Sequence, residues 1–259
     1  MFNNNRSNPS AVQHMRSSSG AIDSAQVDAG LRRYMLGIYN YMALGLLVTA
    51  IIAWYMSTQF SVNADGTLAL TALAQTLYGT PLRWVVLFAP LGMIFLMGPM
   101  ANRSESVGPL RALYFLFTAL MGLSLYYVFL AYSSADVTRA FLVTVIMFGA
   151  LSLYGYATKR NLAPMGTFLF MALIGLIVAS LIGLFFSSPI METVIMYGGV
   201  LIFAGLTAYD TWRIKREYYA YADQGVLLQK AGVMGAVSLY LDFINLFLFI
   251  LRILGGRGE

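Results

Sequence analysis

Seven long apolar stretches constrain the fold of this chain more than any other feature. Each has close to the roughly 17–25 residues that an α-helix needs to cross a hydrocarbon core about 30 Å thick. The hydrophobicity comes in unbroken runs and not in alternating positions, so the pattern predicts helices and not strands. The stretches lie at about 35–56, 84–100, 112–132, 138–157, 165–187, 193–212 and 232–254. We therefore expect an all-α membrane protein built as a seven-transmembrane-helix bundle.

Composition excludes the other broad classes. Hydrophobic residues make up 59% of the chain and charged residues only 10%, where an ordinary soluble domain carries about 25% charged residues. So few charges cannot cover the surface of a soluble globule of this size. The second apolar stretch contains Pro90 and Pro99, which membrane helices tolerate when neighbouring groups satisfy the freed carbonyls.

The two ends of the chain differ from the apolar body. Residues 1–30 are rich in Asn, Ser and charge and contain no apolar core of a signal peptide, so we expect a disordered cytoplasmic tail. Residues 31–256 then form the seven-helix transmembrane domain, and 257–259 a short tail.

Basic residues predict the orientation of the bundle. Twelve of the 16 Lys and Arg residues lie in the N-terminal tail or in the loops that follow the second, fourth and sixth stretches. An excess of Lys and Arg marks the cytoplasmic side, so the N-terminus is expected in the cytoplasm and the C-terminus outside. This distribution accounts for the net charge of +5 and gives no reason to expect a nucleic-acid partner.

Several kinds of chemistry are excluded by what the chain lacks. There is no cysteine, and the single histidine, His14, lies in the polar tail, so a thiolate or multi-histidine metal site cannot be built. No phosphate-binding glycine loop and no Ser/His/Asp set is present. We expect no cofactor and no enzymatic activity.

Acidic residues fall inside apolar stretches at two places, Asp210 in GLTAYDTWRIK and Asp242 in SLYLDFINLFLFILRILGG. A charge at membrane depth costs at least about 2.5–3.5 kcal/mol on insertion scales, so such a residue is a candidate for function. The alternative is a single acid neutralised by a proton or by a buried partner, and Arg213 lies three residues after Asp210.

A polar stripe surrounds the second acid. Ser238, Asp242 and Asn245 occur at i, i+4 and i+7, so they share one face of a helix that should turn away from lipid. The last two apolar stretches are joined by residues 213–231, in which REYYAYADQGVLLQ predicts an amphipathic helical extension. The two helices should run antiparallel as neighbours, with both acids in the cytoplasmic half.

Two carboxyls in close contact at low dielectric do not both ionise readily, so the pair is expected to share one proton and to act as a pH switch. Protonated, the pair bridges the two helices; deprotonated, it repels or recruits a cation. Oxygen ligands suit a hard ion such as Ca²⁺, and two carboxylates without a full cage would bind it weakly and transiently, as conduction requires.

The stretches FAGLTAYDTWRIK, SLYLDFINLFLFILRILGG and MFGALSLYGYATKRNLAPMG resemble the transmembrane Bax inhibitor motif family, which includes Bax inhibitor-1, in its bacterial branch. The resemblance covers about residues 30–256. It implies a seven-helix bundle with the C-terminal helix at its centre, in a bacterial inner membrane, acting as a pH-sensitive calcium leak whose sensor is Asp210 and Asp242. The family pattern also has an Arg at the end of the second helix that pairs with the first Asp. Arg103 in GPMANRSES, about two positions away, is the candidate counter-ion.

Two other functions remain open. In the first, the chain is a non-conducting partner that modulates a membrane-bound protease or a stress pathway. A more remote alternative is an intramembrane aspartyl protease, which also uses acids on adjacent helices. Such proteases carry Gly-x-Gly-Asp at the second acid, where this chain has Leu239-Tyr240-Leu241-Asp242. The partners expected for the calcium leak are bilayer lipids and the calcium ion.

Overall fold

The apolar stretches fold as helices in the computed structural model, which describes residues 9–62, 68–183, 185–186 and 188–255, with side chains from Asp28 onward. Within these residues seven helical segments are long and apolar enough to cross a membrane, α4 and α5 together forming one of them. The all-α, seven-span prediction is confirmed. The helices that form these segments are α1 (Pro9–Ser57), α3 (Leu82–Arg103), α4 (Gly108–Ser124), α5 (Tyr127–Ala131), α6 (Ser134–Ala157), α7 (Ala163–Gly183), α8 (Pro189–Tyr221) and α9 (Gly225–Gly255).

The outward face of the bundle is apolar. Ile146, Phe168 and Leu201 are each more than 70% exposed, and they stand on three different helices. An apolar surface of this extent is not left in water, and it fits contact with lipid. The chain is therefore an integral membrane protein.

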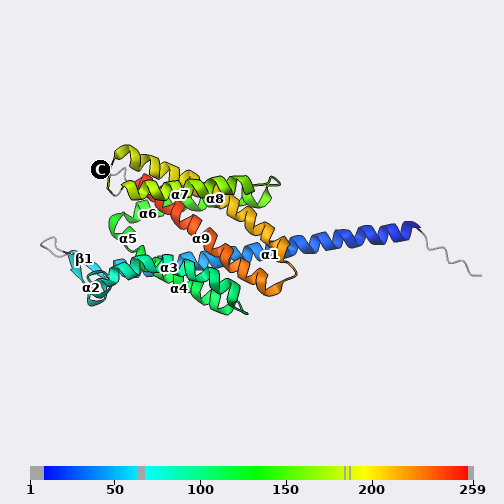
Figure 1. The fold of residues 1–259 in the computed structure, drawn as a ribbon, viewed down its shortest axis with the longest axis horizontal. Coiled ribbons are helices and arrows are strands. Elements are labelled where there is room, and N and C mark those ends of the chain that lie inside the picture. Colours follow the sequence, from blue (N-terminus) through cyan, green and yellow to red (C-terminus); the bar gives the residue numbers. More distant parts are fainter. Residues whose placement is uncertain (1–8, 63–67, 184, 187, 256–259) are drawn as a thin grey trace, which may run out of the picture.

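Helix α9 lies at the centre of the bundle, as predicted. Half of its most apolar window is buried, compared with 11% for α7, and α9 packs against α8, α6 and α1. In Figure 1 it runs diagonally between α7 and α8 on one side and α3 and α4 on the other. Because α9 contacts several helices at once, its polar residues face protein and cavities.

A buried hydroxyl chain fixes α9 against two other helices. Thr49 of α1 donates to the carbonyl of Thr118 on α4 at 2.7 Å. Its oxygen also contacts the Tyr240 hydroxyl at 2.7 Å. The Thr49 proton is used at the carbonyl, so Tyr240 must be the donor in the second bond. Three helices are thus joined at one point in the core.

The N-terminal end of the chain differs from the prediction, and the outermost residues at both ends are not described by the structure. Helix α1 begins at Pro9, within the 1–30 segment expected to be disordered. No proline follows before Pro81, and extending an existing helix costs far less than starting one. Residues 1–8 and the predicted short tail 257–259 lie outside the described residues.

The last two helices are longer than their apolar cores. Helix α8 continues to Tyr221 and α9 begins at Gly225, so only residues 222–224 join them. Most of the 213–231 segment is therefore helical, in agreement with its amphipathic pattern. This tight hairpin makes α8 and α9 antiparallel neighbours.

A small cap that the sequence pattern did not predict covers one end of the bundle. Strands β1 (Phe60–Val62) and β2 (Leu68–Leu70) pair antiparallel, with Phe60 opposite Leu70, and α2 (Ala72–Tyr78) follows. The Phe60 ring stacks on Tyr126, with centroids 4.8 Å apart. The Tyr78 hydroxyl donates to the carbonyl of Leu123 at 2.7 Å. The cap is thereby fixed to the junction of α4 and α5.

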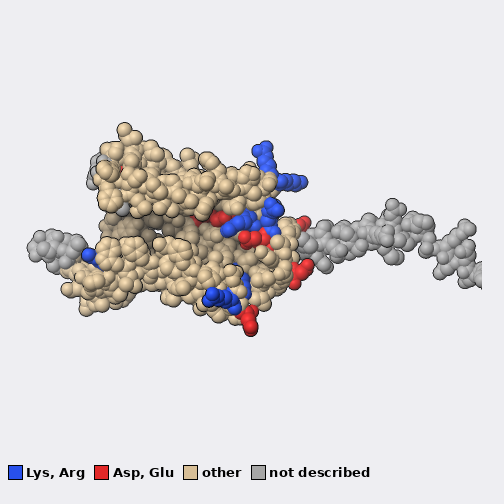
Figure 2. Space-filling view, in the orientation of Figure 1, with Lys and Arg blue, Asp and Glu red and all other residues tan. Residues whose placement is uncertain are grey.

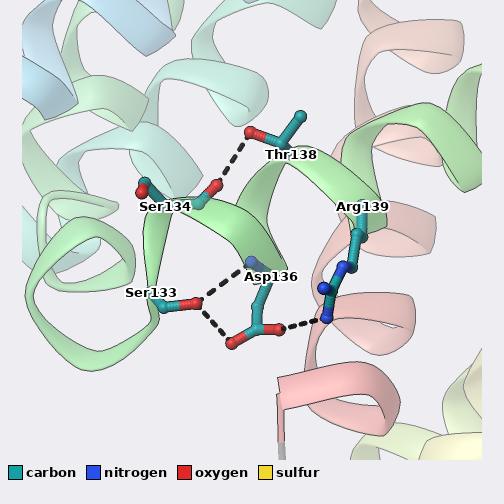
Figure 3. Close-up of polar contacts among 5 residues, drawn as sticks. All are labelled: Ser133, Ser134, Asp136, Thr138 and Arg139. Atoms are coloured by element: carbon teal, nitrogen blue, oxygen red, sulfur yellow. Dashed lines mark hydrogen bonds and ion pairs between the residues drawn. The ribbon is translucent and has the colours of Figure 1, made fainter.

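The start of α6 shows how helix ends are satisfied at the same end of the bundle (Figure 3). The Ser133 hydroxyl accepts from the backbone N–H of Asp136 at 3.1 Å and donates to its carboxylate at 2.6 Å. Arg139 pairs with that carboxylate at 3.6 Å. An acid in the first helical turn also complements the helix dipole, so Asp136 has a structural role.

Charged side chains gather at the opposite end, which we call the basic end and define by loops 104–107, 158–162 and 222–224. Figure 2 shows most of the blue Lys and Arg atoms there, while the side of the bundle that faces the viewer is mostly uncharged. This separation along the bundle axis is typical of a membrane protein with one basic face.

Close packing of α6 against α8 yields a test of the fold. A Cβ atom at Gly155 would lie 2.2 Å from the carbonyl oxygen of Ala208, whereas a Cβ at Gly149 on the same helix would meet nothing within 4 Å. We expect Gly155→Ala to destabilise the protein by about 1–3 kcal/mol through overpacking. Gly149→Ala should be neutral or slightly stabilising. Thermal unfolding in detergent measures both, and equal melting temperatures would contradict this packing.

Candidate functional site

The two membrane-embedded acids meet at the interface of α8 and α9. Asp242 is 4% exposed, and the Asp210 carboxyl is 13% exposed. The two carboxyls are within side-chain hydrogen-bonding reach of each other. The tight hairpin after Tyr221 produces this contact, because it sets the antiparallel register of the two helices.

One oxygen of Asp242 lacks a donor among the described residues. Its Oδ2 atom is buried and accepts no hydrogen bond from them, although a buried acceptor without a partner costs about 1–3 kcal/mol. A proton held between the two carboxyls would turn one of them into a donor to the other. The geometry therefore fits a pair that shares one proton.

Arg213 is the cation beside this acid pair. Its Nη2 atom lies 3.1 Å from Asp210 and donates to the Ser238 hydroxyl at 2.9 Å. The same guanidinium lies 3.8 Å from Glu217, one turn further along α8. Arg213 thus connects α8 to α9 through Ser238, close to the acid contact.

Arg103, the counter-ion expected from the resemblance, lies elsewhere. It stands exposed in the last turn of α3 and does not line the cavity that holds the acids. In the described part of the chain, the ion pair of Asp210 is with Arg213. The spacing of three residues between Asp210 and Arg213 was the signal in the sequence, since residues at i and i+3 are neighbours on a helix.

The acids open onto a cavity of about 1,050 Å³ between α3, α7, α8 and α9. Its polar wall contains Asp210, Arg213 and all three residues of the predicted stripe, Ser238, Asp242 and Asn245. The opposite wall is apolar and comes mainly from α7, through Phe170, Leu173 and Ile177 among others. In Figure 2 acidic and basic atoms are visible within the hollow that separates the lobe of α7 and α8 from that of α3 and α4.

A second pocket of about 480 Å³ continues toward the end opposite the basic end. The two cavities share Asn245 and Phe249, and Arg252 lines the second one. The Phe249 ring stacks on Phe203, with centroids 5.9 Å apart, and packs against Gly199. Phe249 and Asn245 therefore lie where the two cavities adjoin, a position that the sequence did not reveal.

The acid pair does not form a closed metal cage. Among the described residues no group of three or more His, Asp or Glu side chains is placed to hold a metal ion. Asp210 and Asp242 offer oxygen atoms only, which suit hard cations. With one guanidinium beside two carboxyls, the cavity wall carries one net negative charge when both carboxyls are ionised.

Comparison with known proteins places these features in a family. Residues 31–259 match the family described as "Inhibitor of apoptosis-promoting Bax1". A protein of Caulobacter vibrioides is 45% identical, over 90% of this chain and 92% of the relative. A protein of Rickettsia prowazekii is 43% identical, over 90% of this chain and 93% of the relative.

A further relative has an informative name. The inner membrane protein YbhL of Escherichia coli K12 is 40% identical, over 90% of this chain and 95% of the relative. The match extends across nearly the whole membrane domain, in agreement with the resemblance of its Asp-containing motifs. This chain is a member of the Bax inhibitor family of membrane proteins.

Proposed function

We propose that this protein is a pH-sensitive calcium leak channel, gated by Asp210 and Asp242 as they gain and lose a shared proton. The observation that carries the proposal is the contact of the two carboxyls, together with the burial of Asp242 Oδ2 without a donor among the described residues. Protonated, the pair links α8 to α9. Deprotonated, it leaves negative charge at the cavity wall, which repels within the pair or attracts a cation.

The arrangement of the cavities supports a conduction path. The large cavity and the second pocket share Asn245 and Phe249, and in this proposal a movement of the Phe249 ring joins them. Ion binding on such a path must be weak enough for release, and two carboxylates without further ligands satisfy that condition. Arg252 at the second pocket lowers the local concentration of cations, which fits a slow leak.

The proposal includes a location and an orientation. The basic end would face the cytoplasm under the positive-inside rule, which puts the N-terminus inside and the C-terminus outside. The name of the Escherichia coli relative favours a bacterial inner membrane. In this proposal the protein carries no catalytic residue and no cofactor, and calcium is the ion that passes.

The first test replaces the acids. Asp210→Asn and Asp242→Asn keep the shape of the side chain but remove the titratable proton, so calcium flux into proteoliposomes should lose its variation between about pH 5 and pH 8. Glu192→Gln, an exposed carboxyl in the first turn of α8, is the matched control and should keep the wild-type profile.

Either of two results would overturn the proposal. One is a wild-type pH profile in both Asn variants. The other is an absence of flux above empty liposomes for the folded wild-type protein, which would favour a non-conducting partner of a membrane-bound protease or stress pathway.

The second test separates the two arginines. Arg213→Gln removes the positive charge that lies 3.1 Å from Asp210, so ionisation of the pair becomes more costly. The midpoint of the flux profile should move to higher pH by about one to two units. Arg103→Gln should leave the midpoint unchanged, because Arg103 does not line the cavity. A shift in Arg103→Gln alone would assign the counter-ion role to Arg103.

The third test asks whether water reaches the acids. The chain has no cysteine, so each introduced thiol is unique. Ser238→Cys, which lines the cavity, should react with a water-soluble methanethiosulfonate reagent. Ala236→Cys, at a fully buried position on the same helix, should not. Equal protection of both thiols in folded protein would contradict a water-filled cavity.

A further inference from the structure

A second large groove lies on the other side of the bundle, away from the acid pair. It has a volume of about 790 Å³ and runs between α1 and α6, with Phe243 of α9 as its floor. Its lining is almost wholly apolar and includes small residues on both helices, among them Ala43, Ala50 and Gly149. No element of the described chain fills it, so in a bilayer it faces lipid.

The shape of the groove fits an extended hydrocarbon chain. The lining residues follow one stripe on each helix, from Arg32 to Ala50 on α1 and from Phe141 to Tyr156 on α6. The shorter stripe is about 22 Å long at about 1.5 Å per residue. A single leaflet of the hydrocarbon core is roughly 15 Å deep, so one acyl chain can lie along the groove.

The two ends of the groove differ in charge. Arg32 and Tyr156 also line an adjoining polar pocket, which contains Lys215 and Asp28. This pocket is at the basic end of the bundle and carries two positive charges against one negative charge. The Lys215 ammonium donates to the Tyr156 carbonyl at 2.6 Å, and an ammonium has three N–H donors. An anionic phosphate group complements this end, whereas no Lys or Arg lines the other end of the groove.

Polar groups inside the groove are satisfied by protein and do not compete for a ligand. The Tyr39 hydroxyl contacts Ser152, which contacts Thr211 at 2.9 Å. Thr211 donates to the carbonyl of Thr207 at 2.8 Å, so the chain of donors runs from Tyr39 inward and ends there. The groove therefore offers an apolar surface along its length and charges only at its mouth.

We propose that this groove is a binding site for an anionic glycerophospholipid. One acyl chain lies between α1 and α6, and the phosphate group lies against Arg32 and Lys215 at the basic end. The groove borders α6 and α9 but contains neither acid, so this site is independent of the proposed leak.

Native mass spectrometry of the detergent-purified full chain tests the proposal. The probes are phosphatidylglycerol and phosphatidylcholine with identical acyl chains. Since each basic group near a membrane surface contributes modestly to binding of anionic lipid, we expect the wild-type protein to bind phosphatidylglycerol about fivefold more tightly. Equal binding of the two lipids would overturn the role of the basic residues.

Two variants separate the two parts of the site. Arg32→Gln should remove most of the preference for phosphatidylglycerol and retain binding of both lipids. Gly149→Phe places a ring in open space within the groove and should reduce binding of both lipids. Ile146→Phe, on the same helix but 72% exposed and outside the groove, is the matched control and should bind as the wild type does.

Thermal unfolding and gel filtration establish that each variant is folded before binding is measured. If folded Gly149→Phe keeps wild-type binding, lipid does not occupy the groove. If folded Arg32→Gln keeps the full preference for phosphatidylglycerol, the phosphate does not lie at the basic end. Either result would overturn the lipid-site proposal. The outcome of the flux experiments has no bearing on it, because the groove contains neither acid.

Discussion

The high cost of leaving a polar group unpaired in hydrocarbon governs this structure. Within the membrane-spanning segments the helices satisfy their own backbone groups. Many hydroxyls in the core follow the same rule: Thr144, Thr207 and Thr211 each donate to a carbonyl one turn earlier on their own helix. Other hydroxyls find their partners on neighbouring helices. At Thr49, a single oxygen connects α1, α4 and α9. Such points fix the helices against one another, since apolar side chains alone give little specificity in lipid.

The acid pair departs from that rule, and this makes it the strongest candidate for function. Asp242 is buried at the centre of the bundle, and one of its oxygens has no donor in the described structure. Its neighbours are a second acid and a single guanidinium that also binds Ser238. Such a site changes its charge when it gains or loses one proton. Because the sixth and seventh spans meet there, a change of charge also acts on the contact between two helices.

The two large cavities differ in chemistry although both border the central helix. The cavity between α3, α7, α8 and α9 combines an apolar wall with the acids, Arg213 and two uncharged polar side chains. The groove between α1 and α6 is apolar along its length and basic at one mouth. The first fits a proton and a small cation, and the second fits a lipid. In the two proposals, one bundle therefore presents separate surfaces to an ion and to a lipid.

The sequence by itself determined the number and type of spans, and it singled out the two membrane-embedded acids and a polar stripe on the last helix that lines a cavity, because lipid allows only helices and penalises charge wherever it occurs. It did not reveal the cap formed by β1, β2 and α2, since strands of three residues carry too little pattern to detect. Only the tertiary structure decided that Arg103 lies away from the cavity that holds the acids, and that Asn245 and Phe249 lie where two cavities adjoin. Those facts depend on how α3, α8 and α9 pack against one another, and spacing along the chain does not encode the distance between residues on different helices.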